Sequence, residues 1–152
     1  MKLIIAGTRP AEGVRNNVRK YANFMVNLID RIVFYDVSTK LHYLDVTKST
    51  HAWRRIPLDS TIEQVGSGKA YGPDHAGEII SLKYLKRSAR EFPADWKRYG
   101  KQAGMLRNEE MGEELDALYL VWNGVSKGSA DMKARMLRKK KPVHELIIPD
   151  YF

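Results

Sequence analysis

Apolar runs of strand length alternate along the chain with stretches in which apolar residues recur every three or four positions. Residues 2–7, KLIIAG, are a continuous apolar run, as expected of a strand buried on both faces. From Val14 to Ile32, apolar residues recur at the spacing of an amphipathic helix. The alternation continues, with strands expected at 61–66, 87–92, 116–122 and 142–148 and helices at 75–85, 104–115 and 129–141.

This repeated strand–helix alternation predicts an α/β fold with a mostly parallel sheet of about five strands. A chain of 152 residues has the length of a single domain, here residues 1–152. Residues 33–60 interrupt the alternation and are interpreted as an insertion after the first helix. Within them, VFYDV and LHYLDV around STK predict a hairpin, and the remainder is expected to be loop.

Composition narrows the possible functions. The chain has 26 basic and 18 acidic side chains, and its formal net charge of +8 favours anionic partners. It has no cysteine, which excludes disulfides, thiolate zinc sites and cysteine nucleophiles. His42, His51 and His144 lack metal-ligand spacing, and His75 stands alone in a glycine-rich turn, so no metal site is expected. The first residues are too short an apolar run for a signal peptide or a membrane span, and a cytoplasmic protein without a membrane segment is expected.

Polar and glycine-rich turns follow four of the expected strands. They are GTRP, GSGKAYGPD, the segment FPADWKRYG with AGMLRN, and NGVSKGS. In a parallel sheet the turns after the strands meet at one edge, where ligands bind. The four turns therefore predict a single ligand site.

The side chains in these turns suit a phosphorylated ligand. Glycines let backbone amides approach phosphate, and the helix N-termini add a favourable dipole. The hydroxyl donors are Thr8, Ser67, Ser126 and Ser129, and the cations are Arg9, Lys69 and Arg107. Trp96 and Tyr99 offer rings that stack on a base or cover a ribose. Caps and tight turns explain several of these residues equally well, and Trp96 suits a partly buried core position better than a ligand platform.

Two other motifs have simpler explanations. GSGKA lacks the P-loop pattern, because Glu63 and Ala70 occupy positions that require glycine and Ser or Thr. The basic run KARMLRKKK indicates a solvated helix end more readily than a nucleic-acid site.

Four segments together resemble one known family. IIAGTR, GSGKAYGPDHAGE, FPADWKRYGKQAGMLRNEEM and DALYLVWNGVSKGSADM are similar to the YspA-like family, also catalogued as DUF2493, of the SLOG superfamily. Its relatives include the LOG phosphoribohydrolases, DprA and nucleotide-sensing SLOG domains. The resemblance implies a Rossmann-like three-layer sandwich and a homodimer.

The resemblance also implies a ligand: a nucleotide-derived small molecule of the NAD or ADP-ribose type, or a cyclic signalling nucleotide. The chain would act as a sensor or as a sequestering protein. Sequestration is also the role of a phage protein that captures such signals. No separate cofactor is implied. The matching positions are Gly7, Thr8, Arg9, Gly68, Gly72, Asp74, Glu78, Arg107, Asn108, Asn123, Gly124, Ser126, Gly128 and Ser129.

Two departures from the family pattern bear on catalysis. Lys69 stands where the pattern usually has glycine, and Met132 occupies the position of the catalytic glutamate of the LOG enzymes. Methionine transfers no proton, and the neighbouring Asp131 points about 100° away on a helix. Binding is therefore expected. The alternatives are an N-glycosidic hydrolase or transferase using Asp74, Glu78 or Asp131, and a nucleic-acid or host-protein interaction through the basic face.

Overall fold

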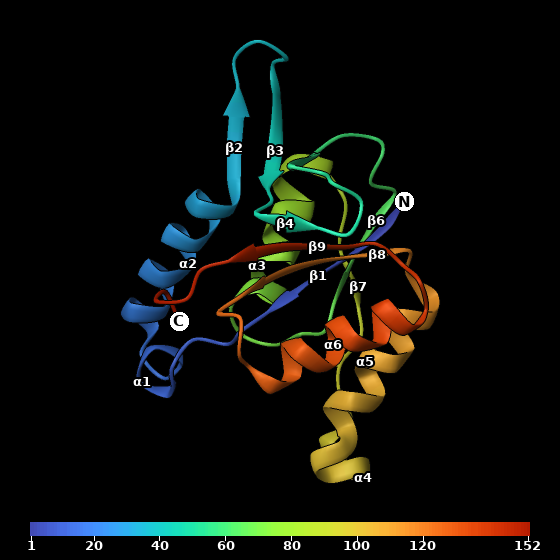
Figure 1. Cartoon of the computed structure of the whole chain (residues 1–152). Helices are drawn as coiled ribbons and strands as arrows, with labels where there is room; N and C mark the ends of the chain where they lie inside the picture. Colours follow the sequence, from blue (N-terminus) through green and yellow to red (C-terminus); the bar gives the residue numbers. More distant parts are fainter.

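Figure 1 shows the computed structural model of the chain, which describes all 152 residues. The strands are β1 (Lys2–Gly7), β2 (Val33–Asp36), β3 (Leu41–Asp45), β4 (Lys48–Ser49), β5 (Arg55–Pro57), β6 (Gln64–Ser67), β7 (Arg90–Glu91), β8 (Ala117–Trp122) and β9 (Val143–Ile147). The α-helices are α1 (Glu12–Arg15), α2 (Val18–Ile32), α3 (Pro73–Ile80), α4 (Trp96–Tyr99), α5 (Ala103–Glu114) and α6 (Lys127–Arg138). A π-helical turn, Ser81–Leu85, extends α3, and a 3-10 turn, Gly100–Gln102, precedes α5.

The main sheet has six strands in the order β4-β9-β8-β1-β6-β7. Five of them are parallel, as expected from the sequence, and β4 runs antiparallel to β9. In chain order, β6 and β7 are added on one side of β1, and β8 and β9 are then added on its other side. This mixed, mostly parallel sheet is compatible with a Rossmann-like α/β fold, in which the strand order reverses beside the first strand.

Alternate residues of β1 point into two separate cores. Leu3 and Ile5 pack on one face of the sheet with residues of α2, α3 and the insertion. Ile4 and Ala6 pack on the other face with residues of α5, β8 and α6. This alternation follows from the two-residue period of a strand. Figure 1 shows α5 and α6 together on one side of the sheet. None of the helices is both long enough and apolar enough to cross a membrane.

The insertion contains the expected hairpin and two further strands. β2 pairs antiparallel with β3, and the hairpin projects from the body of the molecule (Figure 1). The expectation that the rest is loop is wrong, because β5 adds to β3 and β4 adds to β9. The insertion therefore builds a small three-stranded sheet and also extends the main sheet.

The first helix differs from the sequence prediction. A continuous helix was expected from Val14 onward, but the chain breaks at Asn16 and Asn17, and α2 starts at Val18. The Asn17 side chain accepts a hydrogen bond from the amide of Lys20, which caps α2. Val18 is 90% exposed and so does not belong to the apolar face.

Candidate functional site

A cavity of about 670 Å³ opens at the C-terminal edge of the sheet, where the strand order reverses between β1 and β8. The turns after β1, β6, β7 and β8 all contribute to its wall. Its volume is in the range of small-molecule sites. The predicted residues that line it are Gly7, Thr8, Arg9, Gly68, Lys69, Asp74, Trp96, Arg107, Asn108, Ser126, Gly128 and Ser129, and Asp131 and Met132 line it as well.

The remaining predicted residues do not line the cavity: Ser67, Gly72, Glu78, Tyr99, Asn123 and Gly124. The hydroxyl of Ser67 is fully buried and donates to a Glu78 carboxylate oxygen at 2.9 Å. Gly72 has a φ of +85° and starts α3, and its amide donates to the Tyr21 hydroxyl at 3.0 Å. Gly124 has a φ of +89°, which the tight turn after β8 requires.

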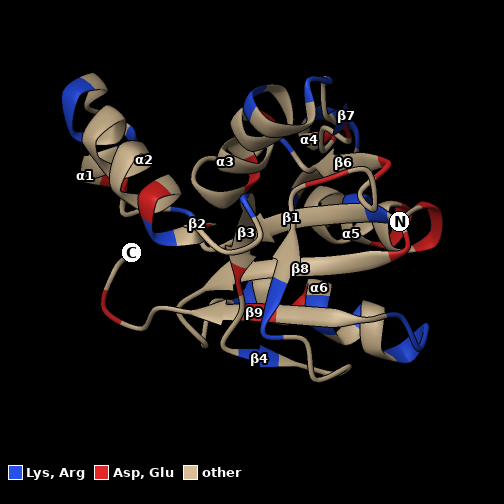
Figure 2. Cartoon of the chain, turned by 90° about the horizontal axis from the view of Figure 1, so that it is seen from above, with Lys and Arg blue, Asp and Glu red and all other residues tan.

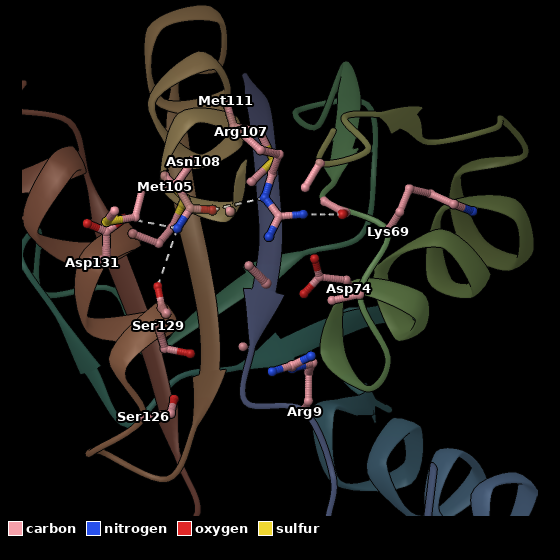
Figure 3. Close-up of a pocket in the computed structure, with 18 of the residues that line it drawn as sticks. Arg9, Lys69, Asp74, Met105, Arg107, Asn108, Met111, Ser126, Ser129 and Asp131 are labelled. Carbon is pink, nitrogen blue, oxygen red and sulfur yellow. Dashed lines mark hydrogen bonds between the residues drawn. The ribbon is translucent and has the colours of Figure 1, made fainter. Parts of the chain in front are cut away.

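A buried carboxylate and two guanidinium groups occupy the centre of the site (Figure 3). Asp74 is 3% exposed, and burial raises its pKa to about 6, although the charge of Arg107 and the amides of Ala70, Gly7 and Gly68 lower it. Arg107 donates to the carbonyl oxygen of Gly68. A Cβ on Gly68 would lie 2.6 Å from Arg107 Nη1 and 2.7 Å from Asp74 Oδ2, so any other residue here would displace these two groups.

Arg9 adds a second positive charge near Arg107. Burial lowers the pKa of Arg107; the carboxylate of Asp74 opposes this decrease, and the charge of Arg9 adds to it. Arg9 is exposed and makes no salt bridge within the chain, and in Figure 3 its guanidinium lies beside the cavity. Two neighbouring cations with one buried carboxylate leave a positive charge available to an anion.

The turn between β8 and α6 presents hydroxyl groups to the same cavity. Asn123 Oδ1 accepts hydrogen bonds from the amides of Val125 and Ser126, at 3.0 and 2.9 Å. The hydroxyls of Thr8 and Ser126 are 2.8 Å apart and link the end of β1 to this turn. Ser126 precedes the first residue of α6, so the positive end of that helix dipole faces the cavity together with Gly128 and Ser129.

Asn108 joins α5 to α6 beneath this turn. Its Oδ1 accepts from Arg107 Nε at 3.1 Å, and its Nδ2 donates to Asp131 Oδ2 at 3.1 Å and to the carbonyl of Gly128 at 3.4 Å. Asp131 also pairs with Arg135 at 2.9 Å. Both polar groups of Asn108 are therefore occupied, and its side chain positions the two helices.

The two carboxylates of the catalytic hypothesis lie in different places. Asp74 lines the cavity, whereas Glu78 is held by Ser67 and by Lys69 Nζ at 2.9 Å. Lys69 also pairs with Glu91 at 3.2 Å, and its hydrogen bonds to these carboxylates raise its pKa. In Figure 3 its side chain points away from Arg107. Its φ of +64° is in the left-handed region, which favours glycine.

Sequence reasoning missed several residues of the wall: Ala6, Ala70, Tyr71, Pro93, Ala94, Lys101, Gly104, Met105, Met111 and Lys127. Most of them lie inside the four turns already singled out, so the turns were the available signal. Lys101 and Lys127 are exposed and have no salt bridge, which adds to the positive charge at the rim. No group of three or more His, Asp or Glu residues is arranged to hold a metal ion.

Lys and Arg residues are spread over several elements (Figure 2). In the basic run at the end of α6, Lys139 pairs with Glu109. Lys141 donates to the carbonyls of Gly112 and Leu115 at 2.6 and 2.7 Å, which satisfies the C-terminal end of α5. Much of this run therefore has partners within the chain.

Compared with protein-family models, curated proteins and solved structures, the chain has no match in any of the three.

Proposed function

We propose that this chain binds a nucleotide-derived small molecule, of the NAD or ADP-ribose type or a cyclic signalling nucleotide, as a sensor or a sequestering protein. The observation that carries the proposal is the pair Arg9 and Arg107, which face one cavity at the reversal of strand order. The proposal includes a Rossmann-like domain of the SLOG superfamily, similar to the YspA-like family.

The wall of the cavity supports an anionic ligand. Guanidinium groups bind phosphate through paired hydrogen bonds, and a helix N-terminus adds amide donors and a favourable dipole. Here the guanidinium groups, the hydroxyls of Thr8 and Ser126 and the start of α6 belong to the same cavity. A ligand that carries one or more phosphates uses all of these donors.

The partners of the acidic side chains favour binding over catalysis. Asp131 is engaged by Asn108 and Arg135, Glu78 lies outside the cavity, and Met132 has no ionisable group. Asp74 is surrounded by three backbone amides and Arg107, so its carboxylate holds the β1 and β6 turns together.

Asp74 also supports a second candidate, an N-glycosidic hydrolase or transferase. Its pKa of about 6, raised by burial, suits a group that exchanges a proton near neutral pH. The specific observation for this candidate is that Asp74, unlike the other lining carboxylate, Asp131, is not held by an Arg or Asn side chain in a hydrogen bond. A nucleic-acid role has less support, because the basic run is largely paired within the chain.

Binding and turnover are separated by incubating the protein with NAD, ADP-ribose, AMP and cyclic nucleotides. Thermal shift reports binding, and chromatography of the same samples reports products. A shift without product supports the binding protein. Product that disappears in Asp74→Asn supports the hydrolase and contradicts pure sequestration.

The site itself is tested with Arg9→Ala. The ligand is the nucleotide that shifts the melting temperature of the wild type. Loss of a charge-assisted hydrogen bond is expected to weaken the affinity for it, measured by calorimetric titration, by about 10- to 100-fold. Arg19→Ala is the matched control, because Arg19 is also exposed but does not line the cavity. Equal affinities of the two variants would exclude Arg9 from the binding site.

A further inference from the structure

Part of the cavity wall is aromatic and apolar. Trp96, at the start of α4, is 57% exposed although it lines the cavity. Pro93, Ala94 and Met105 line the same cavity and have small or flexible apolar side chains. Tyr71, the other exposed ring of the wall, packs edge-on against Tyr21, whereas the Trp96 ring packs against no other aromatic ring.

Gly104 keeps this surface open between Trp96 and Arg107. A Cβ at position 104 would lie 3.4 Å from Cη2 of the Trp96 indole and 4.0 Å from Nη2 of Arg107. Gly104 is in the first turn of α5, where an alanine would favour the helix. Glycine therefore leaves the space between an indole and a guanidinium free of side-chain atoms.

This surface lies apart from the hydroxyl-bearing turn. In Figure 3, Met105 and Arg107 of α5 are on one side of the view, and Arg9 and Ser126 are on the other. The side near Arg9 offers cations, hydroxyls and the start of α6, all of which can donate hydrogen bonds to a phosphate. The Trp96 side offers a π-face and apolar contacts, which suit a planar ring.

We infer that Trp96 is the stacking platform for the aromatic base of the ligand, with the phosphate bound at the Arg9 side. The ligand class is thereby narrowed to nucleotides that carry a base, and abasic ribose phosphates are poor ligands. The inference rests on the proposed function, since it assigns the parts of the ligand to the parts of that same cavity. Trp96 is a specificity-determining residue, and Gly104 keeps the platform accessible.

The test compares AMP and ADP-ribose with ribose 5-phosphate by calorimetric titration of the wild type and of Trp96→Ala. Wild type is expected to bind the base-containing ligands more tightly than ribose 5-phosphate. Trp96→Ala is expected to weaken binding of the base-containing ligands about 10-fold or more, the effect of losing one base–aromatic stack. Its affinity for ribose 5-phosphate is expected to stay unchanged, because the phosphate contacts remain.

Two further variants make the result specific. Tyr99→Ala, the matched control, removes an exposed ring of the same helix that does not line the cavity, and it is expected to leave all affinities unchanged. Trp96→Phe keeps a smaller ring and is expected to retain part of the preference. AMP is expected to quench the tryptophan fluorescence of wild type more strongly than that of Trp96→Phe.

The possible failures are distinguishable. If AMP, ADP-ribose and ribose 5-phosphate bind wild type equally well, or if Trp96→Ala weakens all of them alike, the platform is refuted and phosphate binding at the site stands. If none of them binds at millimolar concentration, and NAD and the cyclic nucleotides do not bind either, the proposed function fails together with the inference. Circular dichroism of each variant shows that a lost affinity is not a loss of folding.

Discussion

At the scale of single residues, the buried Asp74 positions the site but makes the unfolding free energy depend on pH. Burial raises its pKa to about 6 from an ordinary 3.8, so the folded protein holds the proton more tightly than the unfolded chain. Its carboxyl group therefore favours folding at low pH, and that contribution is lost as the pH rises through 6. At neutral pH the buried carboxylate is destabilising.

Asp74→Asn removes this titration, whatever constant change in stability follows from the lost contacts of the carboxylate. Its unfolding free energy relative to that of the wild type is expected to be higher at pH 7.5 than at pH 5 by about 1.5 kcal/mol. Urea denaturation at the two pH values measures this difference. Asp131→Asn, the control, breaks the pair with Arg135 and is expected to lower stability slightly. A loss of stability in Asp74→Asn of equal size at both pH values contradicts this account.

At the scale of elements, the sequence revealed those whose signal is local. The apolar runs of β1, β8 and β9 and the helical spacing of α5 and α6 predicted these elements, and the turns after the strands identified most of the cavity wall. The strands β4 and β5 were missed because they have two and three residues. Their pairing depends on partners distant in the chain, such as His144 opposite Ser49. The cavity residues Lys101 and Met111 were missed because they lie outside these turns and their place depends on how α5 packs.

The break before α2 was missed because apolar spacing alone cannot distinguish a cap from a helix interior. Asn17→Ala is expected to lower the free energy of unfolding by about 1 kcal/mol, since it removes the acceptor for the Lys20 amide. Asn16→Ala is the matched control, because Asn16 is exposed and its side chain makes no hydrogen bond. Urea denaturation of the two variants measures the difference. Equal losses would mean that the Asn17 side chain does not cap α2.

At the scale of the whole molecule, two buried groups, Asp74 in α3 and His144 in β9, have opposite effects on stability when the pH falls. Asp74 stabilises the fold on protonation, as argued above. His144 of β9 is 1% exposed, bonded through Nδ1 to Ser49 at 2.8 Å and stacked on Trp53. Burial lowers its pKa to about 4, and the charge of His51 contributes. The unfolded chain therefore takes up this proton first, and stability is lost as the pH falls from about 6.5 to 4.

The wild-type protein is thus expected to show only a shallow change in unfolding free energy between pH 7.5 and 4.5, because two effects of about 2–3 kcal/mol have opposite signs. His144→Asn retains a polar atom near Ser49 and removes the titration, so its stability is expected to rise on acidification. In Asp74→Asn only His144 of the two groups still titrates, so the stability of this variant is expected to fall on acidification. Urea denaturation across this pH range measures the slopes, which do not depend on any constant loss from repacking. If both variants kept the wild-type slope, Asp74 and His144 would not be the groups that set the pH dependence of the unfolding free energy.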